Sequence, residues 1–183
     1  VLSVGRVAQE KNLEFLLDAW RHLQDEAQLL IVGGGPLLSS LRTRAKAQGL
    51  ENIHFLGMIP HDELLLAGYH RAADVFVMTS MIEVQGLALM EAQATGLPSV
   101  GINSGGTKDL IVDGRNGFLV DPGDQAGFVE AIRRLLRDAD LRQRMSEATL
   151  EEIQKHDLQS VARQWEEAYE EVLAQREIRS EEP

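Results

Sequence analysis

Short apolar runs separated by amphipathic stretches limit the fold of this chain more than any other feature. Each run is largely apolar rather than alternating, which is typical of strands buried on both faces of a sheet. The runs are VLSV (1–4), QLLIV (28–32), IHFLG (53–57), DVFVMTS (74–80), PSVGI (98–102) and GFLV (117–120). Strands that alternate with helices favour a parallel sheet. The pattern predicts an α/β domain with a doubly wound, mainly parallel six-stranded sheet and helices on both faces.

The helices between these runs have recognisable starts and stops. A first helix is expected over 12–23, where Asn12 can cap the N-terminus. A second is expected from about Pro36 to Gln48, with Gly49 as its stop. After Asp124 the pattern becomes wholly helical, and three helices are expected to complete the chain.

Length and charge narrow the class of protein. The 183 residues suit one well-buried domain over 1–183, and the strand pattern at the very start is expected to mark a piece cut at a domain boundary. The net charge of −11 argues against nucleic acid as a partner, because phosphate backbones need a basic face. With no cysteine, disulfides and thiolate metal sites are excluded, and a cytoplasmic setting is compatible. No apolar run approaches the ~20 residues of a membrane span.

The loops after the strands should form one rim, because ligands of such sheets bind beyond the carboxyl ends of the strands. Glycines and polar residues concentrate in these loops, which is a first indication of function. The loops are Gly5–Lys11, Gly33–Pro36, Gly57–Pro60, Ser80–Gly86 and Asn103–Lys108.

Two of these loops suggest phosphate binding. In GRVAQEK (5–11), Arg6 and Lys11 could converge on a diphosphate, with Arg6 forking two oxygens and Lys11 acting as a point charge. The alternative is two solvated loop cations. The turn GGGP (33–36) enters a helix, but it matches neither the dinucleotide fingerprint nor the P-loop, so simple turn chemistry is the favoured explanation for it taken alone.

The stretch EVQGLALME (83–91) places two carboxylates around a helix start. Gly86 is expected to begin a helix that runs to about Thr95, leaving the N–H groups of Gly86 and Leu87 as unpaired donors for an anion. Glu83 lies just upstream, and Glu91 is expected to face outward from the second turn. Carboxylates accept hydrogen bonds from ligand hydroxyls, as in the binding of sugars and riboses. The alternative is that Glu83 only favours the helix dipole and Glu91 is a surface residue.

The histidines give no sign of catalysis or metal binding. They stand at positions 22, 54, 61, 70 and 156, with no ligand spacing and no expected acid partner. Each is expected to be structural or exposed, and a protein-bound metal has no support.

Taken together and in order, five segments resemble the nucleotide-binding half of the group 1 family of retaining glycosyltransferases, which have the two-domain GT-B architecture. GRVAQEKN resembles the family's first loop, LLIVGGGP its glycine turn, and EVQGLALMEAQATGLPSVG its paired-glutamate motif. The stretch IHFLGMIPHDELLLAGYHRAADVFVMTS leads into that motif, and GGTKDLIVDGRNGFLVDPGD resembles the segments that follow it.

The resemblance implies a role for each matching residue. Arg6 and Lys11 would hold the donor diphosphate and stabilise the leaving group, and the N–H groups of Gly86 and Leu87 would add to that phosphate site. Gly5 and Gly35, in the two glycine-containing loops, belong to the same donor-binding set.

The remaining roles concern the nucleoside and the sugar. Glu91 would bond the ribose hydroxyls, Glu83 the hydroxyls of the donor sugar, and the main chain near Met58 and Ile59 would meet the base. Gln85 stands where the family usually has an aromatic residue, and its amide could bond phosphate or sugar.

The resemblance also implies the reaction. It is transfer of a sugar from a nucleoside diphosphate sugar, UDP-sugar by family frequency, with retained configuration and with no cofactor or metal. An N-terminal acceptor-binding domain is missing, and association of the intact enzyme with a membrane surface is possible. The rival hypotheses are a non-catalytic nucleotide-binding or regulatory module and a sugar-nucleotide epimerase of similar shape.

The last helix, over 156–176, resembles the family's terminal helix that crosses back toward the missing domain, and residues 177–183 are expected to fray. Its aromatic residues Trp165 and Tyr169 lie four positions apart and therefore share a face. Core packing is the expected role of these two rings, with a docking face as the alternative.

Overall fold

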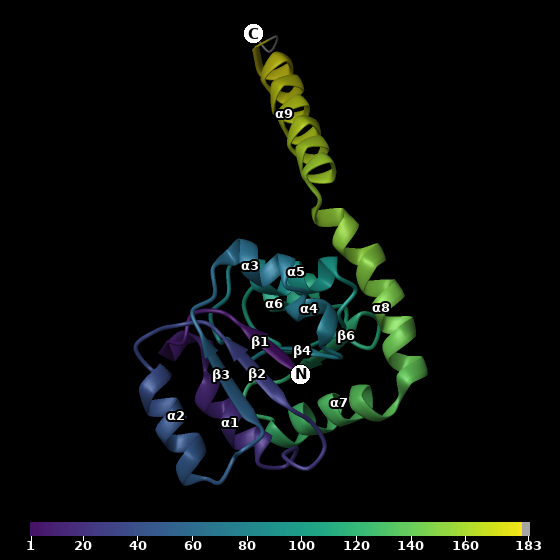
Figure 1. Ribbon diagram of the computed structural model, residues 1–183. Helices are drawn as coiled ribbons and strands as arrows, with labels where there is room; N and C mark the ends of the chain where they lie inside the picture. The colour runs from purple at the N-terminus through teal and green to yellow at the C-terminus, as the bar shows by residue number, and fades with distance from the viewer. Residues whose placement is uncertain (181–183) are drawn as a thin grey trace.

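The computed structural model describes residues 1–180, which form a parallel six-stranded sheet with helices on both faces (Figure 1). The strands follow the order β3-β2-β1-β4-β5-β6. Each is three to five residues long, and all except the edge strand β3 are mostly buried, as expected for a sheet that is covered on both sides. Their bounds are β1 Leu2–Val4, β2 Leu29–Val32, β3 Ile53–Gly57, β4 Phe76–Met78, β5 Ser99–Ile102 and β6 Gly117–Val120. The predicted fold class is confirmed.

The order of the strands reverses between β1 and β4, which makes this junction the topological switch point of the sheet. From β1 the chain winds outward through β2 to β3, then returns to β4 and winds the other way to β6. The junction is narrow: β1 and β4 share the single registered pair Leu2–Phe76, whereas β1 and β2 share three. Beyond that pair the two strands end in separate loops, and their carboxyl ends flank an opening.

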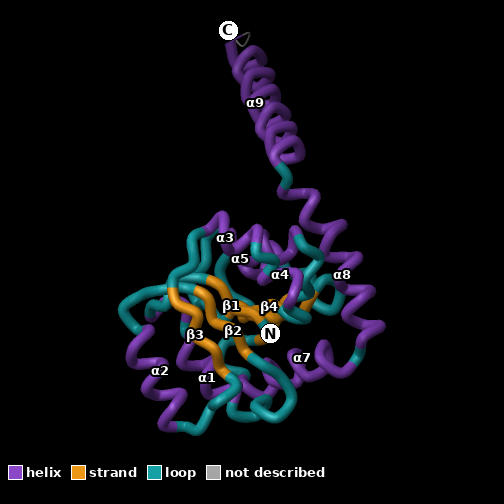
Figure 2. The backbone as a smooth tube through the Cα atoms, in the orientation of Figure 1, coloured by secondary structure: helices purple, strands orange, loops and turns teal. Residues whose placement is uncertain are grey.

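Helices divide into two groups, one on each face of the sheet (Figure 2). On one face lie α1 (Leu13–Trp20), α2 (Leu38–Ala47) and α7 (Gln125–Arg137). On the other lie α3 (His61–Leu66), α4 (Tyr69–Ala72), α5 (Leu87–Ala94) and α6 (Thr107–Leu110). Each group closes its own hydrophobic core, so both faces of every central strand are buried.

The larger core is built around aromatic side chains of α1 and α7. Trp20 and Phe128 are fully buried, and Phe15 meets Phe128 edge to face with 5.3 Å between the ring centroids. The helical spacing of Leu13, Leu16, Leu17 and Trp20 places them all in this core. Burying these side chains contributes roughly 1.5–3 kcal/mol each to the free energy of folding.

Two expected helix starts were wrong in detail. Asn12 has a left-handed backbone (φ 49°) and makes no side-chain capping bond, because it links the end of a short 3-10 helix, η1 (Gln9–Lys11), to the start of α1. Helix α2 begins at Leu38 rather than Pro36, because residues 33–37 form a turn whose backbone bonds to the loop after β1.

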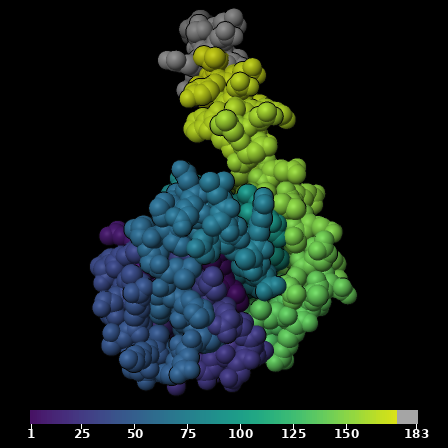
Figure 3. Space-filling model, in the orientation of Figure 1, coloured from purple at the N-terminus to yellow at the C-terminus, as the bar shows by residue number. Residues whose placement is uncertain are grey.

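The C-terminal helices run beside the sheet domain and then leave it. Helix α8 (Ala139–Ile153) packs against α5 and α7, and the 3-10 helix η2 (Gln154–His156) turns the chain into α9 (Leu158–Ser180). Figures 1 and 3 show α9 standing clear of the rounded sheet domain. No helix among the described residues is long and apolar enough to cross a membrane.

Helix α9 differs from what the sequence suggested. It continues to Ser180, past the expected boundary at 176, and residues 181–183 of the expected frayed tail lie outside the described part. Trp165 and Tyr169 do share a face, with 5.9 Å between ring centroids, but they are 60% and 63% exposed. Core packing was therefore the wrong expectation for these two side chains.

Candidate functional site at the switch point of the sheet

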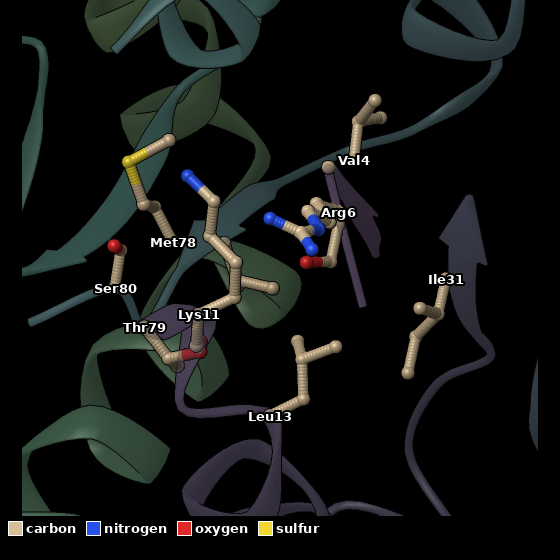
Figure 4. A pocket seen from close by; sticks show the side chains of 11 residues that line it. Val4, Arg6, Lys11, Leu13, Ile31, Met78, Thr79 and Ser80 are labelled. Carbon is tan, nitrogen blue, oxygen red and sulfur yellow. The ribbon is translucent and has the colours of Figure 1, made fainter. Parts of the chain in front are cut away.

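A pocket opens at the carboxyl ends of β1 and β4, where the strand order reverses (Figure 4). The loop after β1 contributes Gly5, Arg6 and Lys11 to its lining, and β4 with its following loop contributes Met78, Thr79 and Ser80. Figure 4 shows the nitrogen-bearing ends of Arg6 and Lys11 at the same pocket, so the two cations of this loop line one opening. The pocket lies where sheets of this topology bind their ligands.

Hydrogen bonds between the two loops fix the backbone beneath the pocket. The Thr79 hydroxyl donates to the carbonyl of Lys11 at 2.8 Å, and the Ser80 hydroxyl donates to the carbonyl of Glu10 at 3.1 Å. The Met81 N–H reaches the same Glu10 carbonyl at 3.3 Å. The backbone carbonyl of Lys11 is thus held by the loop after β4.

Lys11 and Glu83 form an ion pair across the switch point. The Lys11 ammonium donates to Glu83 Oε2 at 2.6 Å, and the two side chains are only 26% and 14% exposed. The other oxygen, Glu83 Oε1, accepts from the Gly86 N–H at 3.3 Å, at the start of α5. The carboxylate therefore sits between a cation and the positive end of a helix dipole.

This arrangement corrects one prediction about the start of α5. Gly86 is the N-cap of the helix, which confirms the expected start, and Leu87 is the first helical residue. The Gly86 N–H, however, is not an unpaired donor, because the Glu83 side chain reaches back and accepts its hydrogen bond. Gln85, one position before Gly86, is exposed, as is Leu87.

Arg6 is the more exposed and the more loosely paired of the two cations. Its side chain is 69% exposed and lies 3.9 Å from the carboxylate of Glu10, four residues further along the loop. An exposed pair at that distance is worth little, so the guanidinium is free to exchange Glu10 for a stronger acceptor.

The glycine turn 33–36 supports the loop after β1 from behind. A Cβ atom at Gly35 would lie 2.3 Å from the carbonyl oxygen of Val7, and one at Gly33 would lie 1.8 Å from that of Gly5. The Val7 N–H donates to the Gly34 carbonyl at 2.9 Å. These glycines permit close packing of the two backbones, and this packing positions the loop that carries Arg6.

A second pair of glycines, Gly105 and Gly106, holds the backbone of Glu83. The spacing of residues in the sequence does not predict this contact. The Gly106 N–H donates to the Glu83 carbonyl at 2.6 Å. A Cβ atom at Gly105 would lie 2.5 Å from the same oxygen. Loop 103–108 was expected at the rim, but its contact with Glu83 joins segments that are distant in sequence. Glu83 is thus fixed at its backbone as well as at its side chain.

Glu91, eight residues after Glu83, has a partner that was not foreseen. Its Oε1 lies 2.7 Å from His61 Nε2, at the first residue of α3, and the Glu91 side chain is 27% exposed. The prediction that no histidine has an acid partner was therefore wrong. Met58 and Ile59 lie just before α3 on the same rim, with Met58 exposed and Ile59 half-buried.

His70 lies behind this pair in the interior. It is 2% exposed, and its Nε2 has no hydrogen-bond partner among the described residues. Burial lowers the pKa of His70 below its usual range, an effect that the nearby Glu91 opposes and His61 reinforces. Within residues 1–180 no group of three or more His, Cys, Asp or Glu side chains is placed to hold a metal ion.

Comparison with known proteins identifies the family. Residues 1–152 match the family model described as Glycosyl transferases group 1. This chain belongs to the group 1 glycosyltransferases. The match spans every strand of the sheet, Glu83 in the loop before α5 and Glu91 within α5.

Two relatives show the range of named activities in this glycosyltransferase family. A sulfoquinovosyl transferase of Arabidopsis thaliana is 38% identical over 160 residues, which cover 86% of this chain and 30% of the relative. A GDP-mannose-dependent alpha-(1-6)-phosphatidylinositol monomannoside mannosyltransferase of Mycolicibacterium smegmatis is 34% identical over 149 residues, covering 75% of this chain and 38% of the relative. The chain thus spans about a third of the length of these two relatives.

The fold of this group 1 chain also matches a solved structure. An Anabaena protein crystallised with UDP superimposes with a TM-score of 0.82 at 23% identity, over 93% of this chain and 48% of the other. At that identity the likeness is one of fold: a GT-B glycosyltransferase contains a Rossmann-like half of this shape.

Proposed function

We propose that this chain is the donor-binding half of a retaining glycosyltransferase that uses a nucleoside diphosphate sugar, with UDP-sugar favoured. The observation that carries the proposal is the meeting of Lys11 and Glu83 at 2.6 Å across the switch point, beside a pocket that Lys11 and Arg6 both line. A cation pair suits a diphosphate, and a carboxylate beside it suits the hydroxyls of a sugar.

The diphosphate is assigned to the two cations. Arg6 presents a planar guanidinium that can fork two phosphate oxygens, and it is exposed and only loosely paired with Glu10. Lys11 adds a compact charge at the same pocket. When the sugar leaves, negative charge grows on the departing diphosphate, and preorganised cations stabilise that charge without a metal or cofactor.

The two glutamates and the rim residues are assigned to the rest of the donor. Glu91 would accept hydrogen bonds from the ribose hydroxyls, and Glu83 from hydroxyls of the transferred sugar. Main chain at Met58 and Ile59, on the same rim as Glu91, would meet the base. The exposed amide of Gln85 is free to bond phosphate or sugar.

The choice of UDP rests on family frequency, and it is supported by the solved structure of similar fold that binds UDP. One relative is instead named for GDP-mannose, so the base is the first property to measure. We further propose that the acceptor is bound by a separate domain, since the chain spans only 30% and 38% of the two relatives.

Calorimetry tests this proposal directly. UDP, GDP and ADP are titrated into the 183-residue chain and into Arg6→Ala, Glu91→Ala and the control Arg21→Ala, which removes an exposed arginine at the end of α1. A hydrogen bond to a charged group contributes about 1.5–3 kcal/mol, so Arg6→Ala should weaken the preferred nucleotide by roughly tenfold or more. Glu91→Ala should weaken it through the lost ribose contact, and Arg21→Ala should leave it unchanged. Unchanged affinity in both site variants would refute the assignment.

A further inference from the structure

The carboxylate of Glu83 occupies the two donors that a phosphate would use. Lys11 Nζ binds Glu83 Oε2 at 2.6 Å, and the Gly86 N–H binds Glu83 Oε1 at 3.3 Å. The ammonium is one of the two cations that the proposed function assigns to the donor diphosphate, and the Gly86 N–H is one of the helix-terminal donors that the family resemblance adds to that phosphate site. A nucleoside diphosphate that enters the pocket must therefore compete with an anion that belongs to the protein.

Charge balance around the pocket makes this competition costly for a free nucleotide. Arg6 faces Glu10 at 3.9 Å and Lys11 faces Glu83 at 2.6 Å, so each cation of the site has a carboxylate within 4 Å. Two positive and two negative side chains leave no net positive charge to attract phosphate. Of the two pairs, Lys11–Glu83 is the shorter and the less exposed, so its carboxylate is the harder one to displace.

The backbone of Glu83 cannot withdraw to make room. Its carbonyl accepts from the Gly106 N–H at 2.6 Å, and Gly105 packs so closely that a Cβ there would lie 2.5 Å from the same oxygen. One residue earlier, the Ile82 carbonyl accepts from the Ser80 hydroxyl at 3.0 Å. With its backbone held, the Glu83 carboxylate can leave Lys11 and the Gly86 N–H by rotation of its side chain.

A sugar on the diphosphate changes the outcome of that rotation. Once displaced, the Glu83 carboxylate needs new hydrogen-bond donors, because a partly buried charge without partners is destabilising. Sugar hydroxyls supply such donors, whereas a free nucleoside diphosphate ends in a phosphate that carries additional negative charge and repels the carboxylate.

We infer that Glu83 is a specificity-determining residue that makes this site prefer a nucleoside diphosphate sugar over the free nucleoside diphosphate. It does so by occupying the phosphate donors until sugar hydroxyls draw it away. The inference rests on the proposed function, and it has a consequence for turnover: after transfer, Glu83 returns to Lys11 and helps to expel the nucleoside diphosphate product.

The test is a comparison of two ligands on the intact 183-residue chain. UDP and UDP-glucose are titrated calorimetrically into the wild type, Glu83→Gln and Glu10→Gln, with Arg6→Ala included to identify the site. Glu83→Gln removes the competing charge and should raise the affinity for UDP by about tenfold. It should raise the affinity for UDP-glucose less, so the preference for the sugar nucleotide should fall. Glu10→Gln removes an equal charge without touching α5 and should leave that preference unchanged.

A second variant and the same titrations keep the result unambiguous. Glu83→Ala removes both the charge and the reach of the side chain, and it should also tighten UDP; circular dichroism reports whether either variant is folded. The inference is overturned if UDP binds through Arg6 but neither Glu83 variant tightens it, or if UDP and UDP-glucose gain equally; the proposed function then stands. If neither UDP nor UDP-glucose binds to any form of the chain, both are overturned.

Discussion

Replacing Gly105 by alanine should disturb the site through the backbone of Glu83. Gly105 has a left-handed backbone (φ +50°), and a Cβ atom built on it would lie 2.5 Å from the Glu83 carbonyl oxygen and 2.9 Å from the Glu83 nitrogen. Both are backbone atoms, which cannot rotate out of the way as the end of a flexible side chain can. The loop that carries Glu83 must therefore shift.

The structure allows the cost to be worked out in two parts. An alanine in the left-handed region costs about 1–2 kcal/mol relative to glycine. The shift also breaks or lengthens the 2.6 Å bond from the Gly106 N–H to the Glu83 carbonyl, which is worth about 1 kcal/mol. Together these lower the free energy of unfolding by about 2–3 kcal/mol.

A matched control separates the two parts. Gly114 has a similar backbone (φ +74°), but a Cβ atom there meets nothing within 4 Å. Gly114→Ala should therefore cost only the conformational part, about 1–2 kcal/mol. Urea unfolding followed by circular dichroism measures both losses, and calorimetry with the preferred nucleoside diphosphate should show changed affinity for Gly105→Ala alone. Equal losses of stability with unchanged affinity in both variants would refute the reasoning.

Two further predictions concern the histidines beside Glu91. His61→Ala should weaken the binding of UDP more than that of 2′-deoxy-UDP, because the 2.7 Å contact to Glu91 Oε1 orients the carboxylate assigned to the ribose. His61→Gln keeps a polar end and should restore part of this difference. Equal weakening of both nucleotides would contradict the role of His61. His70 has a pKa that burial lowers below that of the unfolded chain, which is about 6.5. Its contribution to stability is therefore complete above that pH and lost as the pH falls toward the lowered value. Urea unfolding at pH 7.5 and 5.5 should show a larger loss for the wild type than for His70→Gln, and an equal loss in the two would contradict it.

Much of the fold could be predicted from the sequence because the strands are apolar on both faces. Runs such as QLLIV and GFLV leave no polar face for solvent, so they require helices on both sides, and that requirement nearly fixes the architecture. Helix starts were less predictable. Asn12 is a favoured capping residue, yet its side chain makes no capping bond here, because the preceding η1 places its backbone in the left-handed region.

The site was predictable as a set of loops but not as a set of bonds. The rule that ligands bind beyond the strand ends brought Arg6 and Lys11 to one rim, and the structure confirms that they share a pocket. The sequence did not predict the pairing of Lys11 with Glu83. The family resemblance assigns each residue a role by the part of the ligand that it would contact. Without a ligand, the two opposite charges pair with each other. The contact between His61 and Glu91 depends on how α3 lies relative to α5, and the residues of these two helices contain no signal that predicts it.

The single registered pair between β1 and β4 has a consequence for how the chain folds. Within each half of the sheet, neighbouring strands are joined by one crossover, so β1–β3 and β4–β6 can assemble through contacts of modest sequence separation. Leu2 and Phe76, by contrast, join the two halves across the longest separation of any strand pair in the sheet. We expect the halves to form first and this seam to close last, so truncating Phe76 should speed unfolding far more than it slows folding. The opening that receives the ligand would thus be the last part of the sheet to be built.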